Sequence, residues 1–198
     1  ASGVMRLKLA VQLYTLRNFM NSPESIEQAL RKVKAIGYNA VQQSGPIAVS
    51  NEEFKRLADE IGLTICATHV KFDDLQNRMD DVVAKHKLWE CRYVGLGSLP
   101  PEYRTGKEGY ERFAELASGM GRKLREAGLT FIYHNHDWEF ARFGDATGME
   151  ILYERFDPET VQFELDVHWI QAGGGDPIEW IRKVKGRMGV VHLKDMTL

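Results

Sequence analysis

The 198-residue sequence predicts an α/β fold of alternating strands and helices, and it favours a closed (β/α)8 barrel over an open, doubly wound sheet. Three predicted helices end alike, in a glycine that leads directly into an apolar strand: Gly37, Gly62 and Gly128. Polar residues stand at the carboxyl ends of four predicted strands, where a barrel places its active site. The first strand is not followed by the glycine-rich turn of a dinucleotide-binding sheet.

The apolar pattern defines seven strands and the helices between them. Strands are predicted at 7–14, 40–43, 64–69, 93–97, 131–140, 161–166 and 188–194. Helices are predicted at 22–37, 50–62, 75–89, 110–128, 149–156 and 176–184. Several of these helices begin at a serine or an aspartate that can cap the first turn, and two carry proline directly after the cap.

A complete barrel needs an eighth strand and usually takes about 250 residues. We therefore expect a C-terminally incomplete barrel, with one domain over residues 5–198 and the last βα unit coming after Leu198. Residues 1–4, before Met5, are interpreted as a cloning remnant.

Charge and composition argue against several classes of function. The formal net charge is −2 and both signs are interspersed, so we expect no binding to nucleic acid or to a membrane surface. No apolar run is long enough to span a membrane. The two cysteines, Cys66 and Cys91, do not suggest a disulfide scaffold, and a reducing cytoplasm is the expected location.

Five of the six histidines stand at or just beyond the ends of predicted strands. His134 and His136 are two residues apart, so an extended chain turns both to the same side. Asp166 and His192 end the next two strands, at the height of His134 in a barrel. Imidazole and carboxylate ligands suit Mn²⁺, Zn²⁺, Co²⁺ or Fe²⁺, with Mg²⁺ also open, and three ligands describe a catalytic site better than a structural one. A buried, hydrogen-bonded histidine pair is the alternative.

Other residues are candidates for catalysis or for substrate binding. Glu139 or His136 could act as general base, and Lys194 could donate a proton or stabilise an enolate oxygen. Substrate contacts are assigned to the following residues: Tyr14, Gln43, His69, His168 and Trp169. Trp138 and Trp169 could provide apolar walls, and each of these residues could instead serve packing alone. His86 lies in a predicted helix and is expected at the surface.

Four stretches, at 11–17, 133–140, 164–169 and 192–195, carry a resemblance to a known family. With them the chain resembles the xylose isomerase-like TIM-barrel superfamily, in its sugar phosphate isomerase/epimerase group, nearer to the inosose-dehydratase-like branch. The resemblance implies a divalent metal held by Glu, Asp, His and Glu from strands five to eight. Asp166 and His192 match this pattern, His134 stands where the family has its first glutamate, and the second glutamate would follow Leu198.

The resemblance implies a metal-dependent sugar or cyclitol isomerase or epimerase that removes a proton next to a carbonyl through an enediolate. A dehydratase of a keto-sugar or inosose shares this chemistry and stays open. A barrel related to DNA-repair endonuclease IV is disfavoured by the charge, and a non-catalytic sugar-binding barrel would account for His134. The expected partner is a small carbohydrate, and the oligomeric state, including a homo-oligomer, is left open.

Overall fold

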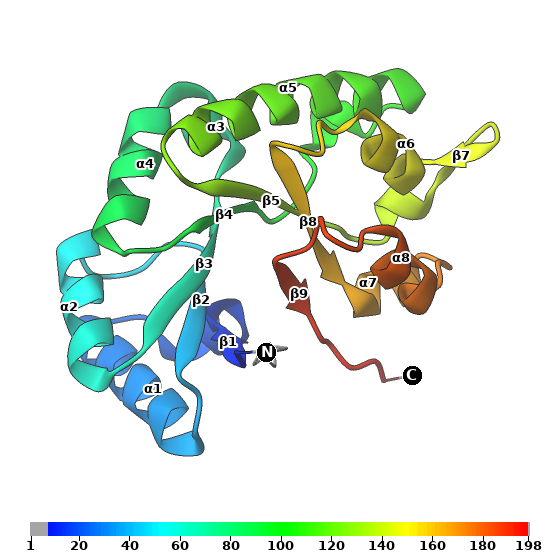
Figure 1. The fold of residues 1–198 in the computed structure, drawn as a ribbon. Helices are drawn as coiled ribbons and strands as arrows, with labels where there is room; N and C mark the ends of the chain where they lie inside the picture. The colour runs from blue at the N-terminus through cyan, green and yellow to red at the C-terminus, as the bar shows by residue number, and fades with distance from the viewer. Residues whose placement is uncertain (1–7, 198) are drawn as a thin grey trace, which may run out of the picture. The chain divides into compact units, whose positions relative to one another are not determined.

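The computed structural model describes residues 8–197, and the chain divides into two compact units (Figure 1). Unit 1 holds residues up to His69 together with Ala84–Arg92, and unit 2 holds Val70–Val83 and Tyr93–Leu198. Each unit has a hydrophobic core of its own.

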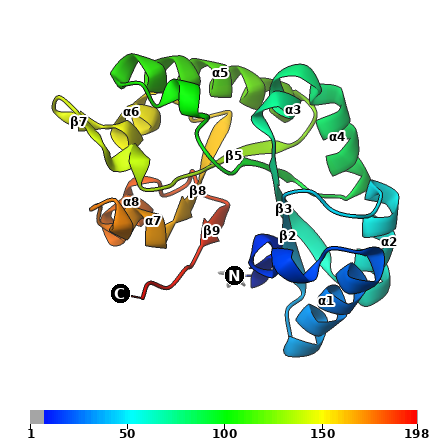
Figure 2. The same ribbon diagram turned by 180° about the vertical axis from the view of Figure 1, so that it is seen from behind.

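In unit 1, three strands run parallel: β1 (Ala10–Gln12), β2 (Ala40–Ser44) and β3 (Thr64–Val70, of which Val70 is assigned to unit 2). The 3-10 helix η1 (Leu13–Phe19) follows β1, and the helices α1 (Pro23–Ile36) and α2 (Asn51–Ile61) connect the strands. Both α-helices lie on the same face of these strands (Figure 2). The unit is therefore built of βα repeats.

Local chemistry explains why α1 begins and ends where it does. The Ser22 hydroxyl accepts a hydrogen bond from the Ser25 backbone N–H, and the Ser25 hydroxyl accepts one from the N–H of Ser22. Pro23 fits the first turn, where its missing N–H costs nothing. Gly37 ends the helix at φ 116°, a conformation that L side chains rarely adopt.

The core of unit 1 lies between its strands and the apolar faces of α1 and α2, and Trp89 closes it. The Trp89 indole donates a hydrogen bond of 2.8 Å to the Asn51 carbonyl. His86 is fully buried, and its Nε2 lies 2.7 Å from the hydroxyl of Thr68 on β3. The expectation that His86 lies at the surface is therefore wrong, because its helix turns this side chain toward the sheet.

Unit 2 contains four parallel strands and the helices that follow them. The strands are β4 (Tyr93–Leu96), β5 (Thr130–His134), β8 (Val161–Asp166) and β9 (Val190–His192), and each pairs with the next. The helices are α3 (Phe72–Asn77), α4 (Met79–Leu88, which continues into unit 1), α5 (Lys107–Glu126), α6 (Gly148–Arg155), α7 (Val167–Ala172) and α8 (Pro177–Lys183). The 3-10 helices η2 (Pro101–Tyr103) and η3 (Trp138–Phe140) and the short hairpin β6 (Arg142–Phe143) and β7 (Ala146–Thr147) complete the unit.

Aromatic side chains fill the space between the helices and the strands of unit 2. The Tyr133 ring lies 5.5 Å from each of the rings of Phe113 on α5 and Phe156 after α6, and all three residues are buried. Helices α5 and α6 lie side by side over this layer (Figure 1). The strand ends that carry histidines are thereby supported by a closely packed layer.

The predicted α/β barrel fold is confirmed, with seven parallel strands among the described residues. Several boundaries differ from prediction. The first strand covers only Ala10–Gln12, with residue 7 outside the described part, and the helix predicted at 75–89 is two helices separated at Arg78. The strand predicted at 131–140 ends at His134, because the chain then turns into η3, and the strand predicted at 188–194 covers only Val190–His192. The helix α7, directly after Asp166, is not among the predicted helices. No helix within residues 8–197 is long and apolar enough to cross a membrane.

Candidate active site

The pairing of β5, β8 and β9 brings their carboxyl ends to one level. His134 on β5 pairs with Glu164 on β8, and Asp166 pairs with His192 on β9. Side chains two residues apart on a strand point to the same face, so Glu164 and Asp166 share one side of β8. The three strands thus place two histidines and two carboxylates together within unit 2.

His134, Asp166 and His192 each offer one ligand atom, and these atoms all lie within 4.8 Å of one another. Nε2 of His134 is 3.2 Å from Oδ2 of Asp166, and Nδ1 of His192 is 3.6 Å from the same oxygen. Two ligands that bind one ion at about 2.1 Å in tetrahedral geometry are about 3.4 Å apart. The spacing therefore fits a shared divalent cation, and the mixed nitrogen and oxygen donors suit such an ion.

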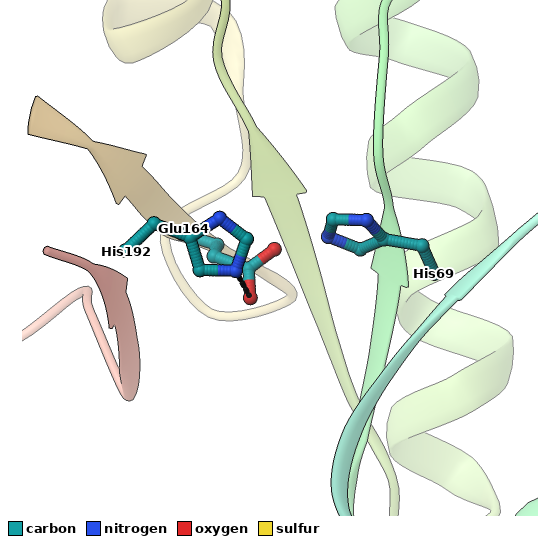
Figure 3. A group of neighbouring side chains, drawn as sticks. All are labelled: His69, Glu164 and His192. Atoms are coloured by element: carbon teal, nitrogen blue, oxygen red, sulfur yellow. Dashed lines mark ion pairs between the residues drawn. The ribbon is translucent and has the colours of Figure 1, made fainter. Parts of the chain in front are cut away.

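The far nitrogen of each histidine is held by a second partner. Nδ1 of His134 lies 3.0 Å from the carbonyl oxygen of Gly97, which requires a proton on Nδ1 and makes Nε2 the nitrogen that can bind a metal. Nε2 of His192 lies 3.2 Å from Oε1 of Glu164, and Figure 3 shows this ion pair as a dashed line. Such partners fix the tautomer and orientation of metal-binding histidines. Both rings are therefore oriented so that, once the nitrogen beside Asp166 is deprotonated, its lone pair can bind a metal next to Oδ2 of Asp166.

Asp166 is held by its neighbours so that one carboxylate oxygen stays available. Oδ1 accepts a hydrogen bond of 3.2 Å from the backbone N–H of Trp169, which caps α7. The Asn135 side chain accepts from the Asp166 N–H at 2.9 Å and donates to the Asp166 carbonyl at 3.4 Å. Oδ2 is thus left to face the two histidines.

The charges of this cluster are strongly coupled. Burial alone would raise the pKa of Asp166, but hydrogen bonds from His134 and His192 hold that pKa well below its ordinary range. Burial alone would lower the pKa of His192, but hydrogen bonds to Asp166 and Glu164 raise it to about 9. Without a metal, His192 is therefore a cation held between two carboxylates.

His136 lies beside this cluster, between two tryptophan rings. Its ring is 4.9 Å from that of His134, stacks on Trp138 at 4.3 Å with an interplanar angle of 12°, and lies 5.1 Å from Trp169. The Arg104 guanidinium lies 3.8 Å over the same Trp138 ring. Two planar groups this close to one centroid occupy opposite faces, so Trp138 has no face left to serve as a wall for a sugar.

Glu139 lies in η3, beyond the end of β5, and it is fully buried. One carboxylate oxygen accepts a hydrogen bond from the Tyr133 hydroxyl, and the other accepts one of 3.0 Å from the backbone N–H of His136. Burial raises the pKa of Glu139 to about 7, against the opposing effect of these hydrogen bonds.

Two further sequence candidates lie near the cluster in unit 2. Lys194 is exposed, with Nζ 4.5 Å from the centre of the Trp169 ring. His168 is the second residue of α7, so it does not continue the strand face of Asp166, and its buried Nδ1 has no hydrogen-bond partner within the described part of the chain.

Three further candidates belong to unit 1. His69 lies near the end of β3, with Nδ1 3.3 Å from the hydroxyl of Ser44. Gln43 is buried on β2 and donates to the Gly45 carbonyl. Tyr14 lies exposed on η1 beneath the guanidinium of Arg17.

Two residues of the site were not singled out from the sequence. Glu164 could have been found by strand alternation, because it precedes Asp166 by two residues on a predicted strand. Arg104 carries no such signal, since its place over Trp138 depends on how the loop after β4 folds back.

Comparison with known proteins finds several to which the chain is similar. It is 24% identical over 185 residues to an inosose dehydratase of Bacillus cereus (strain AH820), a match that covers 91% of this chain but only 56% of the relative. A sugar phosphate isomerase/epimerase from Parabacteroides distasonis has the same fold, with a TM-score of 0.84, 24% identity and coverage of 96% of this chain and 80% of that one.

A xylose isomerase-like TIM barrel protein from Mycobacterium smegmatis, solved in complex with magnesium, superposes with a TM-score of 0.70 at 15% identity, covering 95% of this chain and 74% of that one. At these identities the two structures show the fold alone. The family model described as xylose isomerase-like TIM barrel matches residues 30–197, which is most of the chain. The chain belongs to the xylose isomerase-like TIM barrel family.

Proposed function

We propose that this protein is a divalent-metal-dependent enzyme that removes a proton next to the carbonyl of a sugar or cyclitol, as an isomerase or epimerase does. The observation that carries the proposal is the set of three donor atoms of His134, Asp166 and His192, which lie within 4.8 Å of one another. Each histidine has its far nitrogen anchored, which is how proteins prepare imidazoles for a metal.

A divalent cation at these residues would polarise a substrate carbonyl and leave coordination positions open to the substrate. The chain's own groups would then move the proton. His136 lies next to His134 and is the only further imidazole whose ring contacts a proposed ligand within the described part of unit 2. His136 is the proposed proton acceptor. The exposed ammonium of Lys194, which lies over the Trp169 ring, is the proposed proton donor.

Dehydration is the second candidate outcome, and a specific observation favours it. Curated relatives that match over most of this chain include inosose dehydratases. Elimination of water needs one base and one acid, and His136 with Lys194 could supply both. Epimerisation by two bases needs a group on each face of the reacting carbon.

The metal site can be tested directly by calorimetric titration with Mn²⁺ and Zn²⁺. We expect the wild-type protein to bind and Asp166→Asn to bind at least about 100-fold more weakly, because the amide removes the only carboxylate among the three proposed ligands. An asparagine can still cap α7, so the helix should be kept. Asp145→Asn, in the exposed turn of the β6–β7 hairpin, is the control and should bind as the wild type does. Equal affinity in Asp166→Asn would refute the proposed site.

The reaction can be followed by proton NMR in deuterated water with an inosose and with ketohexoses as probes. Exchange of deuterium into the carbon next to the carbonyl is expected from the metal-loaded protein whether it catalyses isomerisation, epimerisation or dehydration. An unsaturated product identifies dehydration, and an isomer or epimer identifies the first candidate. A metal-loaded protein that exchanges no proton on these probes would count against the proposed chemistry.

A further inference from the structure

The turn that carries His136 is anchored to unit 2 at every residue of η3. The Trp138 carbonyl accepts a hydrogen bond of 3.0 Å from the Tyr110 hydroxyl. The Phe140 ring packs so closely on Gly173 and Gly175 that a Cβ at either glycine would overlap it. Glu139, between these two residues, is buried among the core side chains. The turn is therefore firmly attached to unit 2, and it holds the chain that leads back to His136, two residues before η3.

Glu139 links this turn both to the core and to His136. The Tyr133 hydroxyl, which donates to one of its oxygens, belongs to a fully buried side chain on β5. The second oxygen accepts the backbone N–H of His136 at 3.0 Å. Both oxygens are engaged, and the side chain is not exposed to solvent. The carboxylate is thus placed to fix the backbone of His136 relative to β5.

The ring of His136 is fixed separately. Trp138 stacks on one face of the imidazole, and Trp169 lies against it at 5.1 Å. Arg104 covers the opposite face of Trp138 and donates two hydrogen bonds to the Leu99 carbonyl, so the stack continues into the loop after β4. Glu139 holds the backbone of His136 and the tryptophans hold its ring, so the imidazole is restrained to a single position beside His134.

We propose that Glu139 is a positioning residue that holds His136 in place for proton transfer, and that it is not itself the proton acceptor. The proposal rests on the proposed function, because it assigns the proton to His136. Substitution by glutamine separates the two roles. A glutamine can accept from the His136 N–H with its oxygen and donate to the Tyr133 hydroxyl oxygen with its amide, so it can keep both bonds but cannot act as a base.

The kinetic test compares Glu139→Gln with Glu139→Met, which has a similar length and no acceptor oxygen. We expect kcat of the glutamine variant to stay within about threefold of the wild type. The methionine variant should lose about 10- to 100-fold in kcat, the scale on which small displacements of reacting groups act, with KM and Mn²⁺ affinity unchanged. Equal losses in both variants would overturn the proposal in favour of a catalytic carboxylate, and an unchanged methionine variant would also overturn it.

A second readout needs no substrate and remains decisive if the methionine variant folds poorly. The His136 amide is expected to exchange slowly with deuterated water in the wild type and in Glu139→Gln, and faster in Glu139→Met. Tyr133→Phe is the control, because it removes the bond to the core and leaves the bond to the His136 N–H. Fast exchange in the wild type or the glutamine variant would overturn the proposal. Absence of turnover by the wild type would instead refute the proposed function, while the exchange rates would still decide whether Glu139 holds His136.

Discussion

At the scale of single residues, Glu164 is placed to influence how well His192 binds the proposed metal. It is fully buried on β8, and its oxygen lies 3.2 Å from Nε2 of His192. A carboxylate behind a metal-binding imidazole orients the ring and makes its other nitrogen a stronger donor. We therefore expect Glu164 to act on the proposed metal through His192.

We expect Glu164→Gln to weaken Mn²⁺ or Zn²⁺ binding by about tenfold, at the lower end of the effects found for such outer partners. The amide oxygen can still accept from His192, so the loss measures the carboxylate charge alone. The affinity is measured by calorimetric titration at constant pH, with Glu179→Gln on the exposed start of α8 as the matched control. Equal affinities in the two variants would show that Glu164 does not act on the metal.

The positions of the site residues could be predicted where strand ends determine them. His134, Asp166 and His192 end successive strands of unit 2, and parallel pairing brings such residues together. The buried state of Glu139 could not be predicted, because it depends on Tyr133 reaching it from the core. The burial of His86 could not be predicted for the same reason, since its partner Thr68 is on a strand 18 residues earlier.

At the scale of elements, the approach of α5 to β8 depends on one glycine. A Cβ on Gly121 would overlap the carbonyl oxygen of Thr160, just before β8. Gly119, two residues earlier on the same helix, has nothing within 4 Å of the position of its Cβ. Alanine substitutions at the two glycines therefore distinguish the effect of close packing, at Gly121, from that of helix propensity, at Gly119.

We expect Gly119→Ala to raise the free energy of unfolding by roughly 0.5–1 kcal/mol, because alanine loses less backbone entropy in a helix. Gly121→Ala should lower it by roughly 1–3 kcal/mol, since the backbone of Thr160 must move to admit the methyl group. Urea denaturation of the two variants beside the wild type measures both. Stabilisation by Gly121→Ala would show that α5 does not pack this closely on the start of β8.

Element boundaries could be predicted where a local signal marks them. The serine caps and the glycine ends of α1 and α2 are such signals, and both helices match their predicted bounds to within a residue or two. The start of α7 directly after β8 is harder to predict, because one residue, Asp166, both ends the strand and caps the helix.

At the scale of the whole molecule, the buried ionisable groups give the metal-free protein an unusual dependence on pH. Glu139 has a pKa of about 7 in the fold against an ordinary 4.5, so the folded protein keeps a proton that the unfolded chain has lost between these values. His192 does the same between its ordinary 6.5 and about 9. Asp166 acts oppositely in acid, because its pKa is lowered in the fold and its contribution is lost as the pH falls below its ordinary 3.8.

We therefore expect the free energy of unfolding to be highest near pH 4.5 and to fall as the pH rises to 9, with EDTA present throughout. Where the folded state binds more protons than the unfolded state, each rise in pH favours unfolding. Urea titrations followed by tryptophan fluorescence report mainly on unit 2, which holds Trp138, Trp169 and Trp180. Glu139→Gln should flatten the profile between pH 4.5 and 7 and leave the fall above pH 7, because His192 is untouched. A wild-type profile that rises across this range, or a glutamine variant that retains the full slope below pH 7, would contradict the assignment of these two groups.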